Sequence, residues 1–274
     1  MSDNIQNKLQ DLIILNTSQP ESDWLLQKSS TSAMDLMTAF VSAPRNLSKK
    51  IVQISSEQAQ ELQELVPDFS IQDWSLVRLV RVWLLTQLEA KDPEHFIKNI
   101  DTLFDTAELN ELVALYSALP LLSFPEQWLF RATDAVRSNM GFVFDAIALR
   151  NPYPALYFSE AAWNQLVLKT IFNDKPTYLI PGRETRTNQI LASTLSDFAH
   201  ERWAAGRSVP APVWKLVSPF VADAILSDLK HLFASEKEED RIAAALVCVE
   251  SDYKPAKALV AQHPNLQDQV VSGK

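Results

Sequence analysis

The chain has 274 residues, of which 47% are apolar, and a formal net charge of -9 at neutral pH. This length and apolar content can bury a sizeable core, which excludes a mainly disordered protein. Its 4 glycines fall far below the roughly 7% of average proteins. The shortage argues against sandwiches, barrels, Rossmann sheets and P-loop folds, which use glycine in turns and phosphate loops. The acidic balance argues against a nucleic-acid partner, because phosphate binding requires a basic surface.

The single cysteine and the longest apolar stretch exclude further classes of protein, those held by disulfides or cysteine-bound zinc and those that span a membrane. Cys248 cannot form an intramolecular disulfide or a cysteine-based zinc site, and its apolar neighbours predict a small buried side chain. The N-terminus has no basic leader followed by an apolar core. Residues 112–124, the longest apolar-rich stretch, are well short of the roughly 20 residues that span a bilayer. We therefore expect a soluble, cytoplasmic protein without a transmembrane segment, and peripheral membrane contact stays open.

In the first 68 residues, apolar side chains recur at helical spacing and predict short helices at 4–15, 32–41 and 55–65. No low-complexity tail or long linker separates this part from the rest. We expect the N-terminal helical region 1–68 to pack on a main helical domain 69–274, so that the chain forms one continuous unit.

The next predicted helix, 70–89, is apolar on nearly every side and should be buried between neighbours. Ser70 followed by Asp73 resembles a capping box and predicts its start. Arg78 and Arg81 interrupt the apolar surface and share a face with Trp74.

The remainder of the chain shows no strict sequence repeat, but it predicts roughly one helix per 15–20 residues, with prolines at the joints. The expected helices are 93–105, 108–119, 125–138, 141–149, 158–172, 184–205, 219–233, 236–250 and 252–262. We expect an all-α fold, arranged as an irregular α-solenoid, a HEAT-like stack of antiparallel helix pairs. An irregular globular helical bundle is the alternative.

Helical angles place charged residues on faces that should be buried. Glu160 falls inside the apolar face of helix 158–172, and Arg202 falls near the middle of the apolar stripe of helix 184–205. A charge in such a place is costly unless it is paired and hydrogen-bonded.

Two asparagines accompany these charges, Asn164 at the edge of the first face and Asn188 within the second. The sequence thus predicts that Glu160, Asn164, Asn188 and Arg202 share a buried polar network or line one cavity. Two interpretations stay open, since such a network can serve only to fix helix register or can form a ligand pocket.

Asp197, His200 and Glu201 have the spacing of metal ligands on one helix turn, but they lie opposite the apolar stripe and also fit a solvated face. The sequence contains no H-E-x-x-H, no G-x-S-x-G elbow and no P-loop. We expect no catalytic residue, no cofactor and no resident metal.

Three motifs are long and unusual in composition: N-P-Y-P-A at 151–155, E-A-A-W-N-Q at 160–165 and A-H-E-R-W-A-A-G-R at 199–207. Through them the stretch 115–207 strongly resembles the EboA family of metabolite traffic proteins. Residues 1–70 show no recognisable match. The chain has G-R-E-T-R-T-N at 182–188 where the family has G-L-D-x-R-A-N, a mild departure that bears on ligand specificity.

The resemblance implies a bacterial or algal secondary-metabolite gene cluster and a role in moving a metabolite out of the cytoplasm. It implies no catalytic residue. The family's recurring polar residues coincide with the positions found by helical angle. Together they give the expected pocket-lining or network residues: Arg137, Asn139, Asn151, Tyr153, Glu160, Asn164, Arg186, Asn188, Arg202 and Trp203.

The leading functional hypothesis is a non-enzymatic helical protein that binds a small metabolite or cluster-encoded partner proteins and assists metabolite export. In it, arginines would hold an acidic or phosphate group and Trp203 would supply a flat apolar surface. The alternatives are a pure protein–protein scaffold and a metal-dependent enzyme that uses Asp197, His200 and Glu201.

Overall fold

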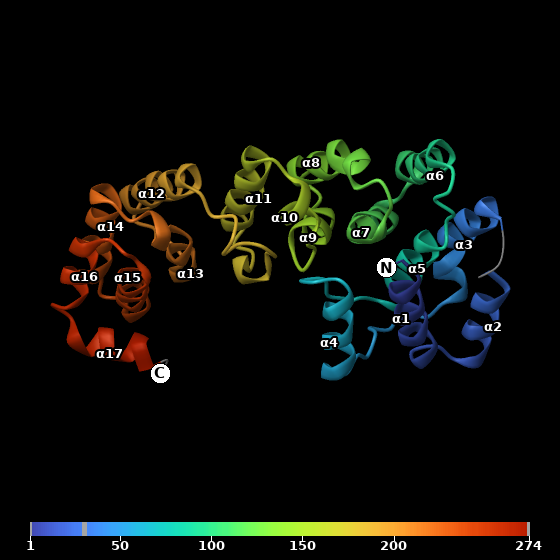
Figure 1. The fold of residues 1–274 in the computed structure, drawn as a ribbon, viewed down its shortest axis with the longest axis horizontal. Helices are drawn as coiled ribbons and strands as arrows, with labels where there is room; N and C mark the ends of the chain where they lie inside the picture. The colour runs from blue at the N-terminus through green and yellow to red at the C-terminus, as the bar shows by residue number, and fades with distance from the viewer. Residues whose placement is uncertain (1, 29–31, 273–274) are drawn as a thin grey trace. The chain divides into compact units, whose positions relative to one another are not determined.

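The computed structural model describes residues 2–28 and 32–272, and within these ranges the regular structure is helical (Figure 1). Seventeen α-helices and four short 3-10 helices account for it, and a single antiparallel bridge joins Ile51 to Ser75. The all-α prediction is confirmed.

The contacts divide the chain into two compact units. Unit 1 comprises residues 1–166 and 179–181, and unit 2 comprises residues 167–178 and 182–274. The division falls inside one helix, α11 (Glu160–Phe172), and the expected boundary near residue 68 lies within unit 1.

Unit 1 is organised around α5. Its helices are α1 (Ser2–Leu15), α2 (Gln19–Lys28), α3 (Ala33–Asn46), α4 (Ser56–Leu65), α5 (Leu76–Thr86), α6 (Pro93–Thr106), α7 (Leu109–Ala118), α8 (Leu129–Arg137), α9 (Gly141–Ala148), α10 (Tyr153–Tyr157) and the first half of α11. Short 3-10 turns follow at Leu119–Leu121 and Pro125–Trp128. Helix α5 packs against α1, α3 and α7, and α7 packs in turn on α9 (Figure 1).

The sequence of α5, L-V-R-L-V-R-V-W-L-L-T, explains its central place. Every residue of this helix except Arg78 is buried. A helix that is apolar on all sides loses the most water-exposed surface when other helices surround it. The expectation of a buried helix is confirmed here.

The start of α5 differs from its prediction. The helix begins at Leu76, where the Ser75 hydroxyl accepts a hydrogen bond from the Arg78 backbone at 3.2 Å. The expected cap at Ser70 and Asp73 is wrong, because Asp73 adopts φ 65°, a left-handed conformation that a helix cannot include. Residues 50–52 pair instead with residues 74–76, through the Val52 amide to Trp74 and the Leu76 amide to Lys50.

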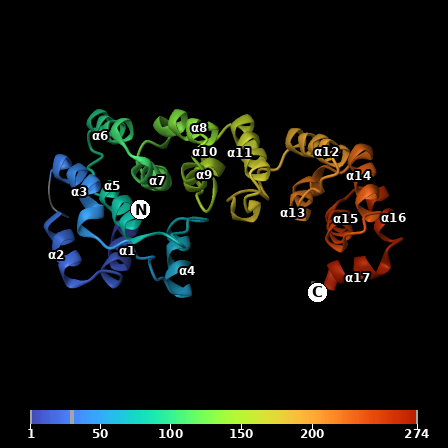
Figure 2. The ribbon, with the colours of Figure 1, turned by 180° about the vertical axis from the view of Figure 1, so that it is seen from behind.

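Unit 2 is organised around α15. Its helices are the second half of α11, α12 (Gln189–Ala204), α13 (Ala211–Trp214), α14 (Asp223–Phe233), α15 (Glu238–Glu250), α16 (Lys254–Val260) and α17 (Pro264–Ser272), with a 3-10 helix at Lys215–Phe220. Another 3-10 turn, Thr177–Leu179, lies at the division between the units. Helix α15 packs against α13, α14, α16 and α17 (Figure 2, seen from behind).

Small side chains let α15 approach so many neighbours. Ala243, Ala244 and Ala245 are buried in its middle, and Cys248 follows them with no exposed surface. The expected buried cysteine is confirmed. Burial raises the pKa of this thiol to about 12, against a smaller lowering by Lys257.

Several boundaries differ for local reasons. Helix α12 begins five residues later than expected, because the Asn188 side chain caps it by accepting from the Leu191 amide at 2.9 Å. Helix α14 begins at Asp223, since Lys215–Phe220 takes the tighter 3-10 form around Pro219. The sequence pattern did not predict α2 or α17.

Among the described residues, no helix has the length and apolar character needed to cross a membrane.

Candidate functional site

The two arginines of α5 lie on the helix that packs against α3 and α7. Arg78 and Arg81 are one helical turn apart and therefore lie on the same side of α5. Both lie on a helix of mainly buried apolar residues, so their charges lose much of their hydration. Such a loss is costly unless other groups interact with the charge.

Arg81 is almost fully enclosed, with 1% of its surface exposed. Its Nη2 donates to Glu111 Oε1 at 2.9 Å, and its Nε donates to the carbonyl of Phe40 at 3.0 Å. Burial lowers its pKa, while Glu111 and then Glu108, at 3.8 Å, oppose that effect. Its remaining terminal nitrogen, Nη1, has no hydrogen-bond partner among the described residues.

Glu111 is itself held in place from two sides. Its second carboxylate oxygen accepts a hydrogen bond from the Glu108 backbone at 3.1 Å, at the start of α7. The acid that neutralises Arg81 is thus part of a helix cap.

Arg78 has a different environment. Its Nε donates to the Ser117 hydroxyl at 2.9 Å, and its guanidinium carbon lies 4.2 Å from the centre of the Trp74 ring. Burial lowers its pKa to about 9, although Asp145 acts in the opposite direction. Within the described chain it forms no ion pair, so at neutral pH it is a cation whose desolvation is only partly offset.

These arginines line a pocket of about 510 Å³, called here the arginine pocket. Its polar wall consists of Lys49, Asp73, Ser75, Arg78, Arg81, Glu108 and Asn110. Its apolar wall consists of Pro44, Ile51, Val77 and Val113. The pairing of residues 50–52 with 74–76 brings Lys49 and Ile51 to the start of α5. A pocket of this size with convergent polar groups is typical of small-molecule sites.

Two of the three acids in or near the pocket are paired with arginines. Asp73 accepts from Arg150 Nη1 at 2.9 Å, and Glu111 is paired with Arg81. Glu108 is exposed and lies 3.8 Å from Arg81. The pocket therefore combines a desolvated cation with an apolar wall.

A second pocket, of about 400 Å³, lies in unit 2 between the 182–187 segment and the 215–219 turn. Lys215 at its wall is 3.2 Å from Glu184 and 3.9 Å from Glu250, and Arg183 is 3.5 Å from Glu184. Its charges are therefore compensated within the protein.

The expected site residues of unit 1 do not line the arginine pocket. Arg137 and Asn139 are exposed. Asn151 and Tyr153 are buried and bind backbone: the Asn151 amide donates to the carbonyls of Tyr116 and Ala146, and the Tyr153 hydroxyl donates to that of Pro125. These two side chains fix the chain around the N-P-Y-P-A motif.

On α11 the expected inward position of Glu160 is wrong, because Glu160 is exposed. It is the first residue of the helix, ahead of the turn in which Trp163 packs. An acid there interacts favourably with the helix dipole from a solvated position. Asn164, one turn later, is buried.

In unit 2 the expected residues lie at the two ends of α12. Arg186 and Asn188 are half-buried before its start, where Asn188 caps the helix. Arg202 is half-buried near its end, and its Nε donates to the carbonyl of Ser208 at 2.7 Å. Its guanidinium carbon is 5.5 Å from the Phe198 ring.

Trp203 belongs to an aromatic stack. Its ring lies parallel to that of Trp214 at 5.7 Å and 4.1 Å from that of His231. Because both neighbours belong to unit 2, this tryptophan packs the end of α12 onto α13 and α14.

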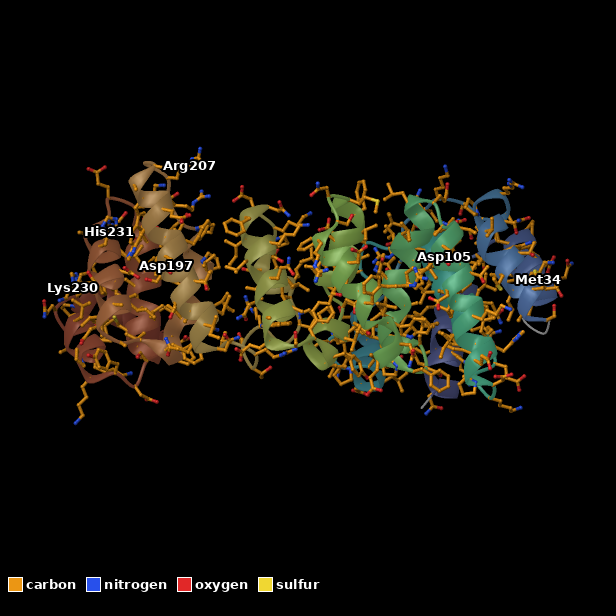
Figure 3. All side chains as sticks on the ribbon, turned by 90° about the horizontal axis from the view of Figure 1, so that it is seen from above. Met34, Asp105, Asp197, Arg207, Lys230 and His231 are labelled. Atoms are coloured by element: carbon orange, nitrogen blue, oxygen red, sulfur yellow. The ribbon has the colours of Figure 1, made fainter. Side chains whose placement is uncertain are left out.

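The three possible metal ligands do not form a metal site. His200 pairs with Asp228 at 2.6 Å, and Ser196 donates to the same buried carboxylate at 2.5 Å. Asp197 and Glu201 are exposed (Figure 3, where Asp197 on α12 is labelled). Across the described residues, no three histidine, cysteine or acidic side chains gather as a metal would require.

The arginines of α5 were recognisable in the sequence, but the pocket around them was not predicted. The pairing of residues 50–52 with 74–76, which completes one wall, carries no sequence signal because it is a single bridge. A detectable signal was the E-x-x-E spacing of Glu108 and Glu111 ahead of an apolar helix.

The sequence matches the family described as metabolite traffic protein EboA over residues 5–218. The match includes all helices that form the arginine pocket and extends into residues 1–70, where the motifs predicted no recognisable similarity. No curated protein and no solved structure is similar enough to match. Because the match covers most of its length, the chain belongs to the EboA family.

Proposed function

We propose that this protein binds a small metabolite in the arginine pocket and passes it on during metabolite traffic without changing it chemically. The observation that carries the proposal is the pocket itself, about 510 Å³ in volume and lined by both charged and apolar side chains. The family description, metabolite traffic protein, supports such a role.

The proposal includes finer points that rest on the family alone. The metabolite would be the product of a secondary-metabolite gene cluster, the protein would act in the bacterial cytoplasm, and delivery would lead to export. The solenoid-like, HEAT-like stacking of helix pairs also stays a prediction.

Metabolite binding can be tested by filling the pocket. Val113 lines it from α7, so Val113→Phe should displace a ligand from the apolar wall. Val41→Phe on α3 is the matched control, because Val41 is 50% exposed and outside the pocket. The protein and both variants would be purified from cells that make the metabolite, and the small molecules released on denaturation would be identified by mass spectrometry.

The expected result is a molecule retained by the wild type and by Val41→Phe, and lost from Val113→Phe. Retention of the same molecule by a folded Val113→Phe variant would move binding away from this pocket. If no molecule is retained by any of the proteins, the binding role fails.

Docking of cluster-encoded partner proteins is the second candidate function. It is favoured by two aromatic side chains of unit 1 that lie in water, Phe130 at 78% and Phe142 at 70% exposure. Co-purification of a cluster-encoded protein with the wild type, and its loss from Phe130→Ser or Phe142→Ser, would support this role.

A further inference from the structure

We infer that the arginine pocket selects an organic anion, in which a carboxylate or phosphate group contacts Arg78 and an apolar body lies along Pro44, Ile51 and Val113. The inference rests on the proposed metabolite binding and specifies the chemistry of its ligand. It is carried by the position of one guanidinium group and by the charges around it.

Two contacts hold the Arg78 guanidinium in place. The Ser117 hydroxyl accepts a hydrogen bond from its Nε, and its central carbon lies 4.2 Å from the centre of the Trp74 ring. Its two terminal nitrogens make no hydrogen bond within the described part of the chain. Two parallel N–H donors on a rigid plane match the two oxygens of a carboxylate or phosphate.

Among the described residues, no acidic side chain forms an ion pair with Arg78. Glu111 neutralises Arg81, and Arg150 neutralises Asp73. Asp145 acts on Arg78 only through space, since no ion pair within 4.0 Å joins the two in the described residues. An anion entering the pocket would meet a positive charge with fixed donors.

Arg81 is the second guanidinium group that lines the arginine pocket. It is enclosed, lines the same pocket, and retains one terminal nitrogen, Nη1, that lacks a partner among the described side chains and backbone. A buried donor of this kind is costly unless a ligand or a small rearrangement satisfies it. A small rearrangement that exposes this nitrogen would give the acidic group a second point of contact.

The protonation state of Arg78 suits this role. Burial lowers its pKa to about 9, which still leaves the group charged at neutral pH. A bound anion would raise the pKa again, so binding needs no uptake of a proton in this range.

The apolar lining of the pocket determines the rest of the ligand. Pro44, Ile51 and Val113 offer apolar contact but no charge. A molecule that pairs an acid with an apolar ring or chain satisfies both walls, whereas a small inorganic anion would leave the apolar wall in contact with water.

The test compares three small probes that share a phenyl ring: benzoate, phenyl phosphate and neutral benzamide. Their affinities for the full chain would be measured by calorimetry. We expect one of the two acids to bind at least about tenfold more tightly than benzamide, and more weakly as salt is added. The better acid shows whether the pocket prefers a carboxylate or a phosphate.

Arg78→Gln should abolish the preference for the acid, because the amide keeps polarity but no charge. The matched control is Arg131→Gln, since Arg131 also lies over an aromatic ring, that of Phe104 at 4.8 Å, but is paired with Asp101 and Asp105 outside the pocket. If Arg78→Gln does not fold, Arg78→Lys is the alternative variant, because it keeps the charge but not the planar donors. It should lower the affinity for the acid by several-fold.

Equal binding of benzamide and the acids, or an unchanged preference in a folded Arg78→Gln protein, would overturn the inference. If benzamide then binds to the wild type but not to Val113→Phe, the pocket still binds small molecules. That result would reject only its preference for an anion. Failure of all three probes to bind would also reject the inference, while the retained-metabolite experiment decides the proposed function separately.

Discussion

The guanidinium group of Arg78 lies over the indole ring of Trp74, with 4.2 Å between its central carbon and the ring centre. Trp74 is itself fixed by an edge-to-face contact with Phe69, at 5.6 Å between ring centres. A core aromatic residue thus orients a charged side chain at the wall of a pocket.

Trp74→Phe should weaken this orientation. A smaller ring attracts the cation less strongly and leaves a void, so we expect the free energy of unfolding in urea to fall by about 1–3 kcal/mol. The affinity for the better acid should fall as well. Trp24→Phe, at a half-buried position outside the pocket, is the control. A destabilised variant with unchanged affinity would show that the ring serves only the core.

The pair Arg81–Glu111 should behave as a buried ion pair, since the two side chains are 1% and 8% exposed. Glu111→Leu leaves the arginine charge unpaired and should reduce the free energy of unfolding by about 3–5 kcal/mol. The double variant Arg81→Met with Glu111→Leu should recover part of that loss. For comparison, Asp101→Ala in the exposed pair with Arg131 should cost less than about 1 kcal/mol. A double variant less stable than Glu111→Leu alone would contradict this account.

Glu21 should make unit 1 sensitive to acid. Burial alone would raise its pKa, but hydrogen bonds from the backbones of Ser18 and Ser48, each at 2.7 Å, lower it from 4.5 to about 2. Because the pKa of Glu21 is lower in the folded state, its ionisation stabilises the fold when the pH is above the pKa of the unfolded chain. This contribution is lost as pH falls from 4.5 toward 2. Its size is on the order of 3 kcal/mol.

The check for Glu21 is the pH dependence of urea unfolding. Glu21→Gln should be less stable than the wild type at neutral pH and should have a smaller slope over the acid range. The matched control Asp23→Asn, on the exposed side of the same helix, should keep the wild-type slope. An equal slope in both variants would assign the acid sensitivity to other carboxylates.

The variant Arg202→Met distinguishes between two candidate binding sites, the arginine pocket and the site expected from helical angles. Arg202 holds the segment after α12 through the Ser208 carbonyl, so its loss should reduce the free energy of unfolding by about 1 kcal/mol. Metabolite retention should be unchanged, because Arg202 is outside the arginine pocket. Lost retention in a stable variant would instead support the site expected from the sequence.

Side chains whose surroundings are local were predictable from the sequence. The apolar run of α5 indicates burial whatever its neighbours are, and the alanines around Cys248 indicate a crowded helix. Helix starts were less predictable, because a cap depends on the backbone before it. Ser70 and Asp73 have the spacing of a capping box, but the left-handed conformation of Asp73 is incompatible with a helix there. Ser75 forms the cap instead.

The candidate site depended on contacts between distant segments. The face of α5 was visible in the periodicity of Arg78 and Arg81, but nothing in the sequence shows that Lys49 and Ile51 line the same pocket. Glu160 shows the converse, since its helical angle matched a buried face while its place in the first turn leaves it in water.

The shielded thiol of Cys248 has a practical consequence. With no exposed surface and a pKa of about 12, it should not react with maleimide dyes in the folded state. Because it is the single native cysteine, a cysteine introduced at any exposed position would carry a dye alone. A fluorophore beside the pocket mouth could then report ligand entry in real time, without removal of a native residue.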